Sequence, residues 1–309
     1  MPMAFVREDV QRVVDLINAQ PGPQMHEVDA PTAREMYLAM VAALEAPAPE
    51  LFRKEDLSIP GPAGPIAGRV YQAATPAGEA PVLTYFHGGG WVIGNLATHD
   101  SLCAEIARLS GHTVVAVDYR LAPEAPFPAA TEDCLAAARW IAEGPGEIGH
   151  AVTGQVVAGD SAGGNLAAAV ARDCWREFPL LAQWLIYPGV DMGASGGSLD
   201  EFAEGYLLTA EGMMWFMHQY QPDAGHRWAS PLHAEDWEGL PPALVFTCSL
   251  DPLRDQGRAY AAELVRHGIR TIFREAKGQV HGCMNARGAV PSAQGDLEGQ
   301  IADLKALMS

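Results

Sequence analysis

Short apolar runs rich in β-branched residues alternate with longer helical patterns over most of this chain. Such runs predict strands, because β-branched side chains suit a pleated and buried surface. The predicted strands are Val82–Phe86, Thr113–Val117, Gln155–Ala158, Gln183–Tyr187, Ala243–Cys248 and Thr271–Arg274. Helical patterns such as Ala129 to Glu143 lie between most of them, which predicts βαβ units. We therefore expect an α/β fold, with a mostly parallel sheet and helices on both faces.

The region before these strands has a different pattern. Residues 1–47 predict two amphipathic helices, the second beginning near Pro31, a residue suited to a first helical turn. These helices could extend the core or form a movable cover over a site, and the sequence leaves both readings open. A hairpin should follow, in which Glu55–Ile59 and Ile66–Tyr71 flank a turn over residues 60–65.

One interval breaks the alternation, a long insert from about Ser198 to Trp228. Thr209 is predicted to cap a helix there, with Glu211 in its first turn. Met and aromatic side chains surround this helix, so two apolar surfaces need cover. Core packing explains one surface, and a substrate pocket, to which adaptable Met side chains are suited, explains the other. The residues predicted to line a pocket or to pack in the core are Trp91, Tyr206, Leu207, Met213, Met214 and Met217.

Composition narrows the class of protein. The chain has 309 residues and no apolar run near the roughly 18 residues of a membrane span. Residues 1–9 lack the basic and apolar blocks of a signal peptide, so a cytoplasmic location is expected. A net charge of −18 argues against nucleic acid as a partner, and it would repel anionic substrates and leave small neutral ones unaffected. Five scattered cysteines indicate buried, reduced thiols and neither a disulfide framework nor a zinc site.

The most informative segment is Val156 to Asn165, where a β-branched run enters a Gly-x-Ser-x-Gly turn and an alanine-rich helix follows. This order predicts that Ser161 occupies a strained elbow at the tip of a strand. Gly159 and Gly163 are expected because a side chain at either position would collide with the neighbouring strand or helix. The pattern therefore predicts that Ser161 is a nucleophile.

A serine nucleophile needs a base, and the base needs an acid to hold its tautomer. His281, between glycines just beyond the last predicted strand, is the predicted base. For the acid, Asp251 directly follows a strand on a loop stiffened by Pro252, and Asp191 is the reserve. Asp255 is expected to brace that loop or Arg254.

An oxyanion formed during acyl transfer needs N–H donors that are fixed in advance. One donor is expected from Ala162, the residue after the nucleophile, and the others from the run Phe86 to Trp91. Three successive glycines there let the backbone pass close to a substrate. A phosphate loop is disfavoured, because no Gly-Lys-Ser/Thr follows and the chain is strongly acidic.

These segments resemble one family. The resemblance rests on the segments His87 to Trp91, Tyr119 to Glu124, Gly159 to Asn165, Asp251 to Gly257 and His281-Gly282. Together they are similar to the hormone-sensitive lipase family of esterases (bacterial family IV), in its GDSAG branch. The resemblance implies an α/β-hydrolase core over residues 48–197 and 229–309. It also implies a helical cap made of residues 1–47 and an insertion at residues 198–228.

For the site, the resemblance implies a triad of Ser161, Asp251 and His281, with oxyanion donors from Gly89, Gly90 and Ala162. Gly88 would shape the turn and His87 would brace the loop. It implies hydrolysis of carboxylic esters with short to medium acyl chains, no cofactor or metal, and in many members a homodimer. One position departs from the family, since Cys283 replaces an aromatic residue two positions after the base, which bears on the shape of the pocket near His281.

Two other functions use the same features. An amidase or deacetylase would use the same acyl transfer to serine. A non-catalytic ligand receptor is disfavoured, because Ser161, Asp251 and His281 are all present. A serine carboxylesterase is the predicted enzyme.

Overall fold

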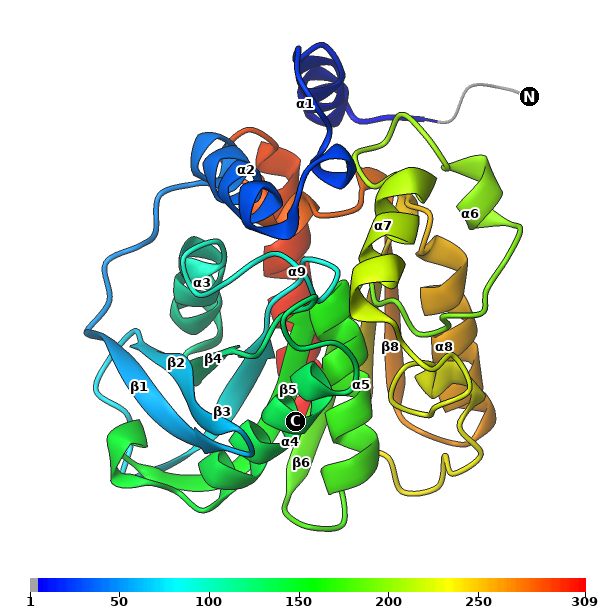
Figure 1. Cartoon of the computed structure of the whole chain (residues 1–309). Coiled ribbons are helices and arrows are strands. Elements are labelled where there is room, and N and C mark those ends of the chain that lie inside the picture. Colours follow the sequence, from blue (N-terminus) through cyan, green and yellow to red (C-terminus); the bar gives the residue numbers. More distant parts are fainter. Residues whose placement is uncertain (1–4) are drawn as a thin grey trace.

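The structure, a computed structural model, describes residues 5–309. The strands are β1 (Arg53–Gly61), β2 (Gly64–Gln72), β3 (Glu79–Phe86), β4 (Thr113–Asp118), β5 (Ala151–Asp160), β6 (Leu180–Ile186), β7 (Ala243–Leu250) and β8 (Thr271–Val280). In the described residues they form an eight-stranded sheet in the order β1-β2-β4-β3-β5-β6-β7-β8 (Figure 1). β2 pairs antiparallel with β1 and with β4, and all other neighbours are parallel.

The helices are α1 (Glu8–Asn18), α2 (Ala30–Leu44), α3 (Asp100–Ser110), α4 (Ala129–Ala142), α5 (Ala162–Cys174), α6 (Ser198–Glu201), α7 (Ala210–Tyr220), α8 (Arg254–Arg266) and α9 (Pro291–Met308). One face of the sheet packs against α4, α5 and α8, and the other against α3 and α9. Strand side chains alternate between the faces: in β3, Val82 and Phe86 pack on the first side, and Leu83 and Tyr85 on the second. The predicted α/β fold is confirmed.

The predicted strands correspond to β3 through β8, most of them longer at their ends than expected. The hairpin is also present, but its turn is shorter than predicted. Pairing continues through Pro60 with Pro65 and Gly61 with Gly64, so only residues 62 and 63 form the turn. β1 is an edge strand, where a proline without an N–H costs no ladder hydrogen bond.

Two helical segments lie above the sheet in Figure 1, and we call them the cap segments: α1 with α2, and α6 with α7. In the first, Val10, Val13 and Val14 pack in the core cluster that contains α9, whereas Tyr37 and Met40 face a cavity at Ser161. The N-terminal helices therefore extend the core through α1 and line a cavity through α2, and a movable cover stays a prediction. The predicted cap region begins at residue 1, and residues 1–4 lie outside the described part. Within residues 5–309, no helix has the length and apolar character needed to cross a membrane.

Candidate active site

Ser161 lies at the sharp turn between β5 and α5, where the strand–turn–helix pattern predicted it. Its φ of 55° and ψ of −117° place the backbone in a sparsely populated region, a form of strain that is common at functional positions. A Cβ on Gly159 would overlap the carbonyl group of Gly163, and one on Gly163 would overlap the carbonyl oxygen of Phe86. The close approach of β3, β5 and α5 thus requires both glycines and fixes the serine.

His281 and Asp251 meet Ser161 from two other strand ends. His281 directly follows β8, and its Nε2 lies 2.8 Å from the Ser161 Oγ. Its Nδ1 lies 2.8 Å from the Oδ2 of Asp251, which follows β7 and is fully buried. A carboxylate only accepts, so Nδ1 carries the proton and Nε2 is free to accept one from the serine hydroxyl. The Leu253 N–H donates to the other carboxylate oxygen at 2.8 Å, which fixes its orientation.

The reserve candidate for the acid lies elsewhere. The Asp191 carboxylate lies 3.0 Å from the Nε2 of His233, and it lines the larger of the two cavities described below. Other histidines also follow Ser161 in the chain, but His218 is exposed on α7 and His267 stacks on Trp237. The structure thus brings Ser161 together with the preferred acid and base.

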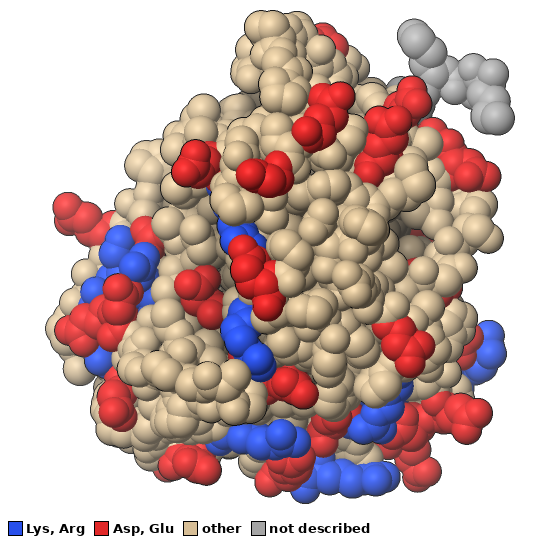
Figure 2. Space-filling model, in the orientation of Figure 1, with Lys and Arg blue, Asp and Glu red and all other residues tan. Residues whose placement is uncertain are grey.

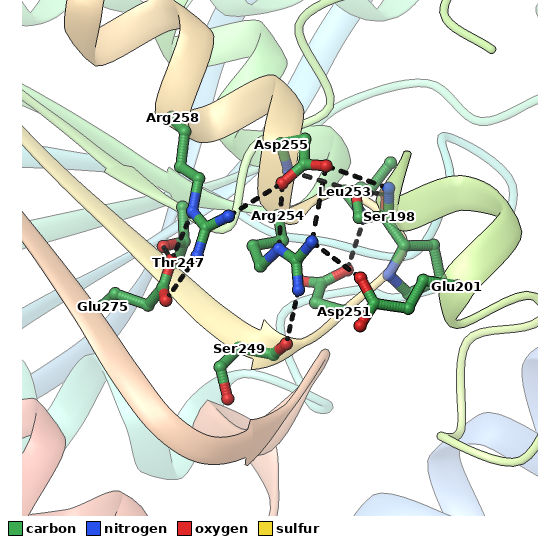
Figure 3. Close-up of polar contacts among 11 residues, drawn as sticks. Ser198, Glu201, Thr247, Ser249, Asp251, Leu253, Arg254, Asp255, Arg258 and Glu275 are labelled. Atoms are coloured by element: carbon green, nitrogen blue, oxygen red, sulfur yellow. Dashed lines mark hydrogen bonds and ion pairs between the residues drawn. The ribbon is translucent and has the colours of Figure 1, made fainter. Parts of the chain in front are cut away.

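The loop that carries Asp251 is tied to the first helix of the insert (Figure 3). The buried Ser198 hydroxyl donates to the Pro252 carbonyl at 2.7 Å and accepts from the Asp255 N–H at 3.1 Å. Asp255 in turn accepts from the Ser198 N–H and from Arg254, both at 2.9 Å. Arg254 also donates to Glu201 at 2.9 Å. Asp255 therefore braces this loop and Arg254, as expected, and it also anchors α6.

The glycine loop after β3 lies opposite the serine. Gly89 and Gly90 have φ of 119° and 57°, values that favour glycine. Neither N–H has a backbone acceptor among the described residues, and the Ala162 N–H belongs to the first turn of α5, where helix amides lack intrahelical partners. Gly89, Gly90 and Ala162 line the cavities that meet at Ser161, so their three amides are candidate oxyanion donors.

Asp160 holds this loop, a role that the sequence analysis missed. Its buried Oδ1 accepts from the Gly88 N–H and the Tyr85 hydroxyl, both at 2.9 Å, and lies 3.2 Å from the His99 Nε2. Burial alone would raise the pKa of Asp160, but the His99 ring and the Tyr85 hydroxyl hold it below its ordinary value. An acidic residue at the end of a buried strand needs hydrogen-bond donors, and this position in the sequence could have indicated the role of Asp160.

His87 packs inside the same loop. Its ring stacks on Tyr119 at 4.2 Å, and its Nδ1 lies 2.8 Å from the Gly88 carbonyl oxygen, to which it donates. Burial, with a contribution from His99, lowers the pKa of His87 to about 3. The neutral ring therefore braces the loop.

Two cavities meet at the serine. The larger, of about 550 Å³, lies under the insert, and the smaller, of about 210 Å³, lies between the N-terminal cap segment and the insert. Ala162 lines the larger cavity, and His281 lines the smaller. The predicted walls are largely confirmed: Trp91, Met213, Met214 and Met217 line the larger cavity and Leu207 lines the smaller.

Two further residues do not line the cavities, and for Tyr206 this agrees with the core packing that the sequence left open. Tyr206 lines neither cavity, because its ring packs edge-on against Phe202. Cys283 is buried with its Sγ 3.7 Å from the Cys248 Sγ, so its side chain does not shape the pocket beside His281. All five cysteines are buried and free, as predicted.

The chain is similar to known proteins over most of its length. The family described as alpha/beta hydrolase fold matches residues 83–285. "Carboxylic ester hydrolase LipN" of Mycobacterium tuberculosis is 45% identical over 74% of this chain, and the chain spans 64% of that relative's length. "Ethyl acetate hydrolase" of Pseudomonas putida is 35% identical over 92% of this chain and 91% of its own. The crystal structure of a hyperthermophilic esterase from the archaeon Pyrobaculum calidifontis is 38% identical, with a TM-score of 0.91 over 99% of this chain and 100% of its own.

Proposed function

The chain belongs to the α/β-hydrolase family and is a carboxylic ester hydrolase, and from this premise we propose that it is a serine carboxylesterase for short- to medium-chain acyl esters. The observation that carries the proposal is the pair of 2.8 Å contacts from Asp251 to His281 and from His281 to Ser161. In this proposal the oxyanion donors are the amides of Gly89, Gly90 and Ala162, residues that line the cavities at Ser161. This arrangement suits acyl transfer to serine.

In the first half of the reaction, the Ser161 oxygen attacks the ester carbonyl while His281 Nε2 takes its proton. The buried Asp251 carboxylate stabilises the imidazolium that forms and keeps Nδ1 protonated. The carbonyl oxygen becomes an oxyanion. Each amide that donates to it raises kcat by a factor of about 10²–10³, because the donors are fixed before the reaction.

The first half ends when the intermediate collapses: the bond from the carbonyl carbon to the alcohol oxygen breaks, His281 gives its proton to the leaving alcohol, and an acyl-enzyme remains on Ser161. Water then enters, His281 takes one of its protons, and the resulting hydroxide attacks the acyl carbonyl. Collapse of this second intermediate releases the acid and returns the proton to the serine. Each step uses only these side chains, the backbone amides and water.

The two cavities suggest where the parts of the ester bind. The leaving alcohol must lie beside His281, which lines the smaller cavity, so the acyl chain extends into the larger cavity beside Ala162. The larger cavity has Met-rich apolar walls, which suit alkyl chains of several lengths. On the face shown in Figure 2, acidic side chains are spread over the cap segments, a distribution that disfavours anionic substrates and suits neutral esters.

The test is Ser161→Ala assayed with p-nitrophenyl esters of increasing acyl length and with the matching anilides. The variant should fold and lose at least about 10⁴-fold in kcat, because no nucleophile remains. Comparable turnover by the variant would contradict the triad. Faster wild-type hydrolysis of the anilides than of the esters would instead favour the amidase.

Two further predictions concern the protein's surroundings. We expect a cytoplasmic location and a homodimer, as the sequence and its resemblance imply. Cell fractionation tests the first, and light scattering of the purified protein tests the second.

A further inference from the structure

Helix α7 of the insert places one aromatic ring directly against the oxyanion loop. A Cβ on Gly90 would overlap three ring atoms of Phe216, so the ring rests on the backbone of Gly90. The φ of Gly90 is 57°, which independently favours glycine at this position. The contact joins a cap residue to one of the proposed oxyanion donors, with no room for any side chain between them.

The same ring stands between the two cavities. Among the described residues, those that line both cavities are Gly90, Ser161, Leu208 and Phe216. Ser161 and Gly90 form the floor, where the ester carbonyl would lie. The insert therefore supplies the dividing wall, with Phe216 packed on the floor and held edge-on against Trp215, at 5.2 Å between ring centroids.

We propose that Phe216 is a specificity-determining residue that separates the acyl chain from the alcohol group of the bound ester. The inference rests on the proposed function, because it needs an ester carbonyl at Ser161. With the ring in place, the acyl chain has about 550 Å³ on the side of Ala162, and the alcohol group has only about 210 Å³ on the side of His281. Without the ring the two spaces join, and a long chain on the alcohol side can cross into the larger cavity.

Isomeric esters isolate this effect. Ethyl octanoate and octyl acetate have the same atoms and similar hydrophobicity, but the long chain lies on the acyl side in the first and on the alcohol side in the second. Apolar pockets distinguish ligands by roughly 10–200-fold per misplaced methylene group. The wild-type protein should therefore favour ethyl octanoate by at least tenfold in kcat/KM.

The experiment measures this kcat/KM ratio by titrating the released acid for the wild type, Phe216→Ala, Phe216→Leu and His218→Ala. Phe216→Ala should reduce the ratio to threefold or less, and Phe216→Leu should give an intermediate value. His218 is exposed on the same helix and lines neither cavity, so His218→Ala should keep the wild-type ratio. Circular dichroism establishes that each variant is folded, and Phe216→Leu serves as the test if Phe216→Ala is not.

The outcomes are distinct. A wild type that hydrolyses p-nitrophenyl butyrate but shows no preference between the isomers overturns the inference and leaves the proposed function standing. An unchanged ratio in folded Phe216 variants also overturns it. If kcat/KM falls equally for both isomers, the ring only supports the oxyanion loop, and the inference is overturned as well. A wild type without activity on any ester contradicts the proposed function and the inference with it.

Discussion

In the core, Asp251 is fully buried, and each of its carboxylate oxygens has a partner within 2.8 Å. On the cap helix α7, Met214 is 65% exposed, and Tyr220 is the buried residue at the helix end. The core positions the reacting groups through strand ends, close backbone contacts and buried hydrogen bonds. The cap segments shape the cavities through flexible apolar side chains. This difference suggests that changes in the core affect turnover, whereas changes in the cap affect which ester is turned over.

The largest effect should come from breaking the acid in the core. Asp251→Asn keeps the shape of the side chain but favours the wrong tautomer of His281, so kcat for p-nitrophenyl butyrate should fall by about 10⁴. Asp191→Asn removes the rejected candidate and should lower kcat far less. Equal losses in the two variants would contradict the assignment of Asp251.

The same substitution in both regions sharpens the comparison. Gly163→Ala would force a Cβ into the Phe86 carbonyl oxygen, so the free energy of unfolding should fall by about 3 kcal/mol or more, with loss of activity. Gly212 on α7 meets only the Thr209 Oγ, at 3.3 Å. Gly212→Ala should therefore be neutral or stabilise by up to about 1 kcal/mol through helix propensity.

Urea denaturation of the two alanine variants measures both values. A stable, active Gly163→Ala protein would mean that β3 and α5 can move apart. This result would contradict a rigid turn at Ser161.

A substitution where α6 contacts the loop that carries Asp251 should give an intermediate effect. Ser198→Ala leaves the Pro252 carbonyl and the Asp255 N–H without their partner, which should cost about 1–3 kcal/mol of stability. Because α6 also lines the larger cavity, KM should rise more for p-nitrophenyl octanoate than for the acetate. Ser195→Ala, at an exposed neighbouring position, should stay within about 0.5 kcal/mol of the wild type. An equal loss in both variants would contradict the anchoring role.

The same division explains what the sequence could predict. The strands, the elbow at Ser161 and the candidates Asp251 and His281 depend on local patterns and on the rule that parallel strands end at one edge. The packing of Phe216 on Gly90 depends on how two segments far apart in the chain dock, which no local pattern encodes. Whether Tyr206 lines the pocket or packs in the core depends on its contact with Phe202, and the pattern of apolar residues alone does not decide this. The pattern predicts too long a turn after Ile59, because a proline is compatible with pairing only at an edge strand, and the edge position of β1 is not evident from the sequence.

The smallest effect concerns the pH dependence of stability, and it tests the core alone. His87 has a pKa lowered to about 3 in the folded protein, from an ordinary value of 6.5. The unfolded chain therefore binds the extra proton between these values, so stability is complete above about pH 6.5 and falls as the pH is lowered toward 3. One such group contributes at most about 1.4 kcal/mol per pH unit to the slope of unfolding free energy against pH.

His87→Asn places a non-titrating amide N–H near the position of Nδ1 and should flatten that slope between pH 7 and 5 by this contribution. Between pH 8 and 7 the two proteins should have equal slopes, because the ring is neutral in both states. Urea denaturation at the three pH values measures the difference, and identical slopes between pH 7 and 5 would show that the His87 ring is not held neutral by its burial.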